Sequence, residues 1–164
     1  FISLLCPNPF FETLDDVWHD LASWEPLLEF ELEIPEEGIE FGMRQPSQII
    51  AVDNFGDVPC GCEVIFRALG PVTNPELLLM DTGEYIRILT TMNNGDEYHI
   101  YTHFAEKRVI SIINGTESNA FYLLDTSSNF FQLEPGMNNL RYDASDNLEL
   151  LDVSLHYRPQ FLGV

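Results

Sequence analysis

Three residues near the middle of the chain, Glu97, His99 and His103, could bind a metal ion, because carboxylates and imidazoles are common zinc ligands. Apolar and polar residues alternate over 97–104, which predicts a β-strand. Residues four apart in a strand are separated by about 13 Å at ~3.3 Å per residue, whereas a zinc ion needs both imidazole nitrogens at ~2.0–2.1 Å. His99 and His103 therefore cannot share an ion on a straight strand, and Glu97 with His99 would need ligands from elsewhere. We expect a half-buried strand face without metal, and metal binding is the alternative.

The strand predicted over 97–104 has two distinct faces. The apolar face would hold Tyr98, Ile100, Thr102 and Phe104, and the polar face Glu97, His99, Tyr101 and His103.

The three cysteines, Cys6, Cys60 and Cys62, form an odd set without a framework of pairs. This usage predicts synthesis in a reducing compartment without a disulfide scaffold. Cys60 and Cys62 lack the C-x-x-C spacing and a second ligand pair. We interpret them as buried thiols, with a metal or redox role as the alternative.

Carboxylates raise the question of glycoside hydrolysis, which uses a pair of them. Glu29, Glu31 and Glu33 alternate along one predicted strand, but among 27 acidic residues such a row arises by chance and suits a solvated face. No nucleophile elbow, dinucleotide fingerprint or P-loop occurs. The segment 143–147 lacks the central Gly and the closing Glu of a calcium loop. The N-x-T sequence at 114–116 is read as a turn. We expect no catalytic, metal-binding or cofactor-binding residues and no enzyme.

Exposed aromatic side chains offer a different chemistry, because Trp and Tyr can stack on sugar rings. The candidates lie on or near predicted elements, and most must be core in a chain of this size: Trp18, Trp24, Tyr98, Tyr101, Tyr122 and Tyr157. A carbohydrate-binding surface therefore remains an alternative function.

Short strands separated by turn residues must position these groups. Asn94-Gly95 predicts a hairpin between 84–91 and 97–104, and Asn114-Gly115 predicts a second hairpin. Pro135-Gly136 fits a type II turn. Strands are expected at 30–34, 47–53, 62–68, 84–91, 97–104, 107–113, 138–143 and 148–157.

The final predicted strand, 148–157, has a strict alternation that fixes its register. Leu151, Val153, Leu155 and Tyr157 should face the core, whereas Asp152, Ser154 and His156 should face outward or meet a neighbouring element. Arg158, which precedes a proline, should be extended and could pair with a carboxylate.

A single helical pattern covers residues 13–23. Leu14, Val17, Trp18 and Leu21 fall at helical spacing, and Thr13 with Asp16 resembles a capping box. No internal repeat or linker is visible. The expected fold is therefore an all-β antiparallel sandwich with one short helix near the N-terminus, in a single domain over residues 1–164.

The net charge limits the classes of partner that the chain could bind. The 164 residues carry 27 acidic and 7 basic side chains, a net charge of −20. This balance argues against nucleic acid and anionic membranes, which both need a basic patch. No run reaches transmembrane length. The apolar start FISLL has no initial Met or basic flank and is expected to lie inside a longer protein rather than to be a signal peptide.

Taken in order, the turn motifs resemble the C-terminal half of the distal tail proteins of long-tailed bacteriophages and prophages. The resemblance rests on the whole series and covers almost the entire chain, least of all 12–46. The motifs are CPNPFF (6–11), VDNFGD (52–57), NP (74–75), DTGE (81–84), NGD (94–96), SNFFQLEPGMN (128–138) and YRPQFLGV (157–164).

The resemblance implies a galectin-like, jelly-roll type β-sandwich located in the virion, at the tip of the phage tail. In that family an N-terminal domain, absent here, forms a hexameric ring between the tail tube and the tail-associated lysin. The C-terminal domains lie outside the ring and can hold receptor-binding proteins. Some members carry an inserted module that binds host-wall carbohydrate, and no insertion of that size is visible here. The family supplies no catalytic residues.

These implications define the expected function: a structural component of the tail tip or baseplate, made in the bacterial host cytoplasm, which mediates protein attachment and host adsorption. The isolated chain should be monomeric, and the full-length protein hexameric. Phe130, Phe131 and Leu133, before the Pro135-Gly136 turn, should pack one end of the sandwich.

Overall fold

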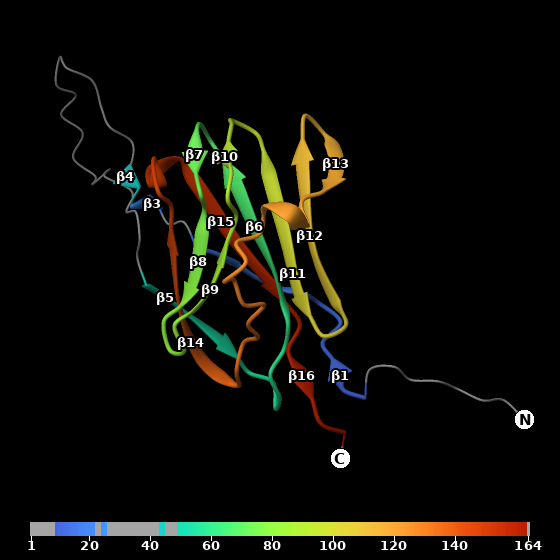
Figure 1. Cartoon of the computed structure of the whole chain (residues 1–164). Helices are drawn as coiled ribbons and strands as arrows, with labels where there is room; N and C mark the ends of the chain where they lie inside the picture. Colours follow the sequence, from blue (N-terminus) through green and yellow to red (C-terminus); the bar gives the residue numbers. More distant parts are fainter. Residues whose placement is uncertain (1–8, 22–23, 26–42, 45–48, 164) are drawn as a thin grey trace, which may run out of the picture.

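The computed structural model describes residues 9–21, 24–25, 43–44 and 49–163. Two antiparallel sheets pack face to face and account for most of the ordered structure (Figure 1). The predicted all-β antiparallel sandwich is confirmed. In these residues, no helix is long and apolar enough to span a membrane.

The larger sheet has six strands in the order β13-β12-β11-β6-β15-β2. All of its neighbouring strands are antiparallel. The strands are β2 (Val17–Asp20), β6 (Cys62–Ala68), β11 (Glu97–His103), β12 (Glu106–Ile113), β13 (Thr116–Asn119) and β15 (Leu151–Tyr157).

The smaller sheet has four strands in the order β5-β14-β8-β9. They are β5 (Ile49–Asn54), β8 (Glu76–Leu79), β9 (Glu84–Arg87) and β14 (Gly136–Asp143). Three short pairs complete the strands: β1 (Phe11–Glu12) with β16 (Gln160–Phe161), β7 (Val72–Thr73) with β10 (Thr91–Met92), and β3 (Trp24–Glu25) with β4 (Met43–Arg44). Two 3-10 turns, η1 (Phe121–Leu123) and η2 (Leu148–Leu150), lie in connections.

The core lies between the two sheets and follows the predicted alternation. Strand β15 buries Leu151, Val153, Leu155 and Tyr157 to 2% exposure or less, so its predicted register is confirmed. The predicted strand began at 148, but residues 148–150 form η2 instead. Opposite β15, the four-stranded sheet buries Leu77, Leu79, Ile86, Leu140 and Tyr142.

Two of the predicted turns are confirmed. Asn114 and Gly115 both have positive φ, 51° and 73°, and connect β12 to β13 with Ile113 opposite Thr116. Gly136 has φ 93°, as the second central residue of a type II turn requires. Beyond it, the Asn138 amide fixes the turn by accepting from Glu134 N and donating to Glu134 O and Gly136 O. Phe131 and Leu133 are buried and Phe130 packs on the core, as predicted.

The Asn94-Gly95 turn exists, but the hairpin predicted around it is wrong. Gly95 has φ 86°, yet β9 pairs with β8 and β11 pairs with β6 and β12. The partner of β9 is instead the preceding strand β8, and in the turn between them the N–H of Gly83 donates to Leu79 O at 2.8 Å. The turn at 94–95 instead leads the chain from the short β7–β10 pair into the six-stranded sheet.

The predicted helix over 13–23 is also wrong where the structure describes it. Thr13 Oγ1 bonds the carbonyl oxygen of Asp15 rather than capping a helix. Residues Val17–Asp20 form β2 and pair with β15, while Leu14 is 97% exposed. Pairing with a long core strand stabilises the segment more than its weak helical pattern does. Residues 22–23 lie outside the described residues.

Phe104 differs from its prediction as well. It lies beyond the end of β11, in the turn to β12 where Ala105 has φ 63°, and is 89% exposed. The strand predicted at 30–34, the glutamates Glu29, Glu31 and Glu33, and Cys6 lie outside the described residues.

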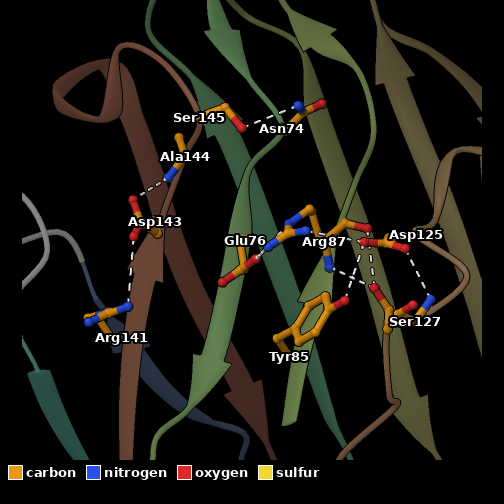
Figure 2. Close-up of polar contacts among 11 residues, drawn as sticks. Asn74, Glu76, Tyr85, Arg87, Asp125, Ser127, Arg141, Asp143, Ala144 and Ser145 are labelled. Atoms are coloured by element: carbon orange, nitrogen blue, oxygen red, sulfur yellow. Dashed lines mark hydrogen bonds and ion pairs between the residues drawn. The ribbon is translucent and has the colours of Figure 1, made fainter. Parts of the chain in front are cut away.

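The free edge of β9 is covered by the connection over residues 125–129. Asp125 N donates to Arg87 O and Asn129 N donates to Tyr85 O, each at 2.9 Å. The Arg87 side chain reaches Glu76 from Nε at 2.6 Å and Asp125 from Nη1 at 3.3 Å. Figure 2 shows Glu76, Tyr85, Arg87 and Asp125 turned toward one another. We call these four residues the Arg87 cluster; together with the backbone bonds it protects the edge from pairing with another chain.

Candidate functional site: the outer face of the six-stranded sheet

A row of side chains crosses the outer face of the six-stranded sheet, with one residue from each strand between β12 and β2. The strand registers place Arg108 opposite Tyr101, Tyr101 opposite Glu63, Glu63 opposite His156, and His156 opposite Trp18. The row exists because the opposite faces of these strands are fixed in the core, so alternation turns these residues outward.

Glu63 is at the centre of this row and accepts bonds from several side chains. Its Oε1 lies 2.8 Å from His99 Nδ1 and its Oε2 lies 3.5 Å from His156 Nδ1. The Tyr101 hydroxyl also bonds it. Burial alone would raise the pKa of the Glu63 carboxyl, but the bonds from His99 and Tyr101 outweigh it, and the pKa lies below the ordinary value. Glu63 is therefore a carboxylate at neutral pH.

The two histidines on Glu63 have pKa values shifted in opposite directions. The hydrogen bond to Glu63 raises the pKa of His99, with further support from Glu97, whose Oε2 lies 3.4 Å from Nε2. Desolvation lowers the pKa of His156 despite the nearby Glu63. Between these pKa values, His99 carries a positive charge and His156 is neutral.

Trp18 covers His156. The two ring centroids lie 3.3 Å apart at an interplanar angle of 41°, yet Trp18 remains 64% exposed. The Nε2 atom of His156 is buried and has no hydrogen-bond partner among the described residues. With Nδ1 directed at Glu63, this nitrogen is an unused acceptor beneath an open indole surface.

Ion pairs flank the row on both sides. Arg67 Nε bonds Glu97 Oε1 at 2.7 Å. Arg158 forms an ion pair with Asp16, which is therefore the carboxylate partner that the sequence left open. Arg108 stacks over the Tyr101 ring, with Cζ 4.0 Å from the centroid. These contacts hold the polar groups of the face in fixed orientations.

Two hollows open beside the row and share His156 as a lining residue. The larger has a volume of about 750 Å³ and the smaller about 270 Å³. The larger lies between the ends of β6, β11 and β15 and the N-terminal segment, and is lined in part by Glu12, Asp16, Glu63, His103, Arg158 and Gln160. The smaller is lined by Trp18, Asp20, Ile65, Arg67, Glu97, His99, Asp152, Ser154 and His156. We call the two hollows together the outer groove.

The three residues considered as possible metal ligands are only partly brought together. Glu97 and His99 share the outer face, but His99 is occupied by Glu63, and His103 lies at the far end of β11. The described part of the chain holds no group of three or more His, Cys, Asp or Glu side chains that could bind a metal ion. The predicted half-buried strand face is confirmed, because Glu97, His99, Tyr101 and His103 are all partly exposed.

Cys60 and Cys62 are buried free thiols, as predicted. Burial raises the pKa of each to about 12. Cys62 Sγ lies 3.5 Å from Thr102 Oγ1 inside the core. Thiols protonated so firmly are poor nucleophiles and metal ligands.

The aromatic candidates separate into two groups. Tyr98 and Tyr157 are core residues, and Tyr157 donates to Asp53 O at 2.8 Å. Trp18 and Tyr122 are exposed, at 64% and 82%. Trp24 lies on β3, and its side chain is outside the described structure. In the 143–147 segment, Asp143 Oδ1 accepts from Ala144 N, which is a local turn contact.

Sequence reasoning missed Glu63, Arg67 and the contact of His156 with Trp18. The strand 62–68 was predicted correctly, but nothing within it shows that Glu63 lies between two histidines. That proximity depends on the registers of β6 with β11 and of β6 with β15. The one local signal was the polar character of alternate positions in a strand whose other face is apolar.

Comparison with known proteins defines the class. The sequence model of the family described as siphovirus-type tail component, C-terminal domain, matches residues 55–161. The match covers more than half of the chain, and the chain belongs to this family of structural phage tail components. No curated protein sequence matches the chain.

A solved structure supports the fold assignment. The crystal structure of the SPP1 Dit protein, described as a paradigm of the hub adsorption apparatus in phages that infect Gram-positive bacteria, matches with a TM-score of 0.63 at 15% identity. The match covers 96% of this chain and 51% of that chain. A weaker likeness, to the phage P2 baseplate in its activated conformation with Ca, has a TM-score of 0.47 at 11% identity and covers 87% of this chain and 52% of that one. The chain thus spans about half the length of both solved chains.

Proposed function

We propose that residues 1–164 form one peripheral domain of a distal tail protein, which attaches other tail proteins at the tail tip and takes part in host adsorption. The family match over residues 55–161 is the observation that carries this proposal. The description of SPP1 Dit as the hub of an adsorption apparatus supports it, since the two folds agree. The proposed role of the domain is structural and non-catalytic, and the domain is located in the virion. Its proposed partners are the tail tube, the tail-associated lysin and a receptor-binding protein.

An apolar surface near β1 and β16 supports the attachment role. Phe11, Phe55 and Leu162 are 66%, 54% and 56% exposed. Phe11 pairs with Phe161 across the two strands, and the Phe55 and Phe161 rings lie 6.3 Å apart. Figure 1 places β1 and β16 side by side at one end of the sandwich. Contiguous exposed apolar surface of this kind marks protein interaction sites.

Co-purification tests the attachment role. The chain is expressed with each of the other tail proteins encoded beside it, and complexes are isolated by affinity and size. The double variant Phe11→Ser, Leu162→Ser should raise the dissociation constant of the complex at least tenfold. The control Tyr122→Ser also replaces an exposed apolar ring with serine, but on a distant turn, and should leave the complex intact. Failure of every tail protein to bind the unaltered chain would contradict the proposal.

Assembly is proposed to reside outside this chain. The isolated 164-residue chain should be monomeric, because six copies at −20 each repel one another. The full-length protein should be a hexameric ring held by its other domain. Light scattering on both proteins, at low and at physiological salt where screening shortens to about 8 Å, measures this directly. A stable hexamer of the chain alone would overturn this division, and a monomeric full-length protein would weaken the proposal as a whole.

A further inference from the structure

The outer groove has the shape of a site for an extended ligand. Its two hollows share His156 as a lining residue and are lined by residues of β11, β6, β15 and β2. The larger, at about 750 Å³, lies within the range of roughly 300–1,000 Å³ typical of small-molecule sites. The smaller hollow, at about 270 Å³, extends it past Trp18. A chain of several small rings would fit this outline better than a single compact molecule.

Trp18 supplies a flat apolar surface within the groove. Strand pairing of β2 with β15 fixes its backbone, and the His156 ring supports one side of the indole. The remaining surface is open, since the residue is 64% exposed. A large aromatic surface that is open to solvent and held on an ordered strand can bury apolar area when a ligand covers it. The C–H faces of sugar rings are a suitable cover, because they are apolar while their rims carry hydroxyls.

The polar groups around Trp18 are oriented in advance. Arg67 is bonded to Glu97, His99 to Glu63, and Gln160 to Glu12 at 2.8 Å. The Glu97 carboxylate has more lone pairs, and the Arg67 guanidinium more N–H groups, than the contact between them uses. Hydroxyl groups, which both donate and accept, can satisfy both kinds at once. His156 lines both hollows and supports the Trp18 ring from beneath.

The negative charge of the groove and of the whole chain disfavours some classes of ligand. Acidic residues outnumber arginines along both hollows, and the whole chain carries −20. A polyanion such as a phosphate-containing wall polymer would be repelled. A basic protein segment would have to displace arginine or histidine from carboxylates that already have partners. A neutral ligand meets neither obstacle.

We propose that the outer groove binds a neutral oligosaccharide, with one sugar ring stacked on Trp18 and its hydroxyls bonded by Arg67 and Glu97. The inference deepens the adsorption part of the proposed function, and the attachment part does not depend on it. The site belongs to the sandwich itself and requires no inserted module.

A panel of neutral oligosaccharides, built from hexoses and N-acetylhexosamines, tests the proposal on the whole 164-residue chain. Array binding selects the best ligand, and calorimetry measures its dissociation constant. Trp18→Ala should weaken binding at least tenfold. Tyr122→Ala, which removes a still more exposed aromatic side chain from a site away from the groove, should change it less than twofold. Arg67→Ala should weaken binding as well, and the fold should be retained because the Arg67 side chain is 53% exposed.

Circular dichroism of each variant separates loss of binding from loss of folding. The proposal is overturned if no neutral oligosaccharide binds at millimolar concentration, or if binding is unaffected by both Trp18→Ala and Arg67→Ala. It is also overturned if only polyanions or only basic peptides bind. Since the co-purification experiment uses different residues and different partners, either proposal can fail while the other stands.

Discussion

The two main sheets each carry a charged cluster on the outer face, and the clusters differ in how completely their groups are satisfied. In the Arg87 cluster, the guanidinium reaches two carboxylates and lies 4.8 Å from the Tyr85 ring centroid, and Tyr85 donates to Asp125. Around Glu63, by contrast, a buried imidazole nitrogen lacks a partner among the described residues and a Trp lies open beside two hollows. A closed network of this kind holds a chain segment in place, whereas an incomplete network beside a cavity is typical of a binding site.

The core between the clusters sets the largest expected effect. Leu155 is fully buried on β15, one residue from His156. Leu155→Ala should lower the free energy of unfolding by about 2–5 kcal/mol, because it leaves a cavity between the sheets. Urea denaturation measures this. A loss below about 1 kcal/mol would show that β15 faces the other way.

Two arginines test the comparison directly. Arg87→Ala should cost about 1–2 kcal/mol, since it breaks charged hydrogen bonds that hold the 125–129 connection and leaves Glu76 and Asp125 without their cation. Arg67→Ala should cost about 0–1 kcal/mol, because its pair with Glu97 is a surface ion pair with Arg67 53% exposed. Equal costs in urea denaturation would remove the distinction between a structural and a binding cluster.

The two histidines on Glu63 should give opposite pH dependences. The pKa of His99 is raised above 6.5 by Glu63, so its stabilising contribution is complete below pH 6.5 and is lost as pH rises through the folded-state pKa. The pKa of His156 is lowered, so the native state resists protonation and is destabilised as pH falls below 6.5. Below pH 6.5, the His99→Gln variant should therefore be less stable than the unaltered chain. In the same pH range, the His156→Gln variant should be more stable than the unaltered chain. The opposite pH dependences require that the carboxylates facing the two rings are charged. These carboxylates are Glu63, Glu97 and Asp16.

Unfolding free energies measured over a pH series decide this prediction. The same sign for both variants would mean that the bond from His99 to Glu63 and the desolvation of His156 do not shift the two pKa values in opposite directions.

Metal removal should have the smallest effect. Because His99 is already bonded to Glu63 and His103 lies apart from it, EDTA should leave the melting temperature unchanged. A drop of several degrees would restore the metal interpretation of Glu97, His99 and His103, and thermal denaturation with and without chelator measures it.

Local pattern predicted the strands that the core fixes most firmly. The 62–68 strand matches β6 residue for residue, and the alternation from Leu151 to Tyr157 was correct because one face of each strand is fully buried. The segment 13–23 failed because four apolar residues at helical spacing are a weak signal, and β2 gains its conformation from β15, which follows it by more than a hundred residues.

The candidate site was harder to predict from the sequence, because it also depends on pairing between strands that are distant in the chain. His99 and Trp18 were both identified from their chemistry, but they are connected only through Glu63 and His156, which requires three strand registers. The hairpin predicted from Asn94-Gly95 shows the limit clearly: the turn itself was correct, while the partner strand of β9 is the preceding strand β8.

The pairing of β1 with β16 also determines how the domain would respond to mechanical load. A force applied to the chain before Phe11 and after Phe161 pulls antiparallel neighbours apart from a shared end. Their contacts would then break in sequence rather than in shear: first the two β1–β16 pairs, then the ion pair between Asp16 and Arg158, then β2 from β15. The bonds from Asp57 N to Gln160 O and from Leu162 N to the Asp57 carboxylate would be loaded at the same first step. Through these successive contacts, the domain could yield to a pull at its ends, and the outer groove would lose part of its lining at an early step, because Glu12, Asp16, Arg158 and Gln160 line its larger hollow.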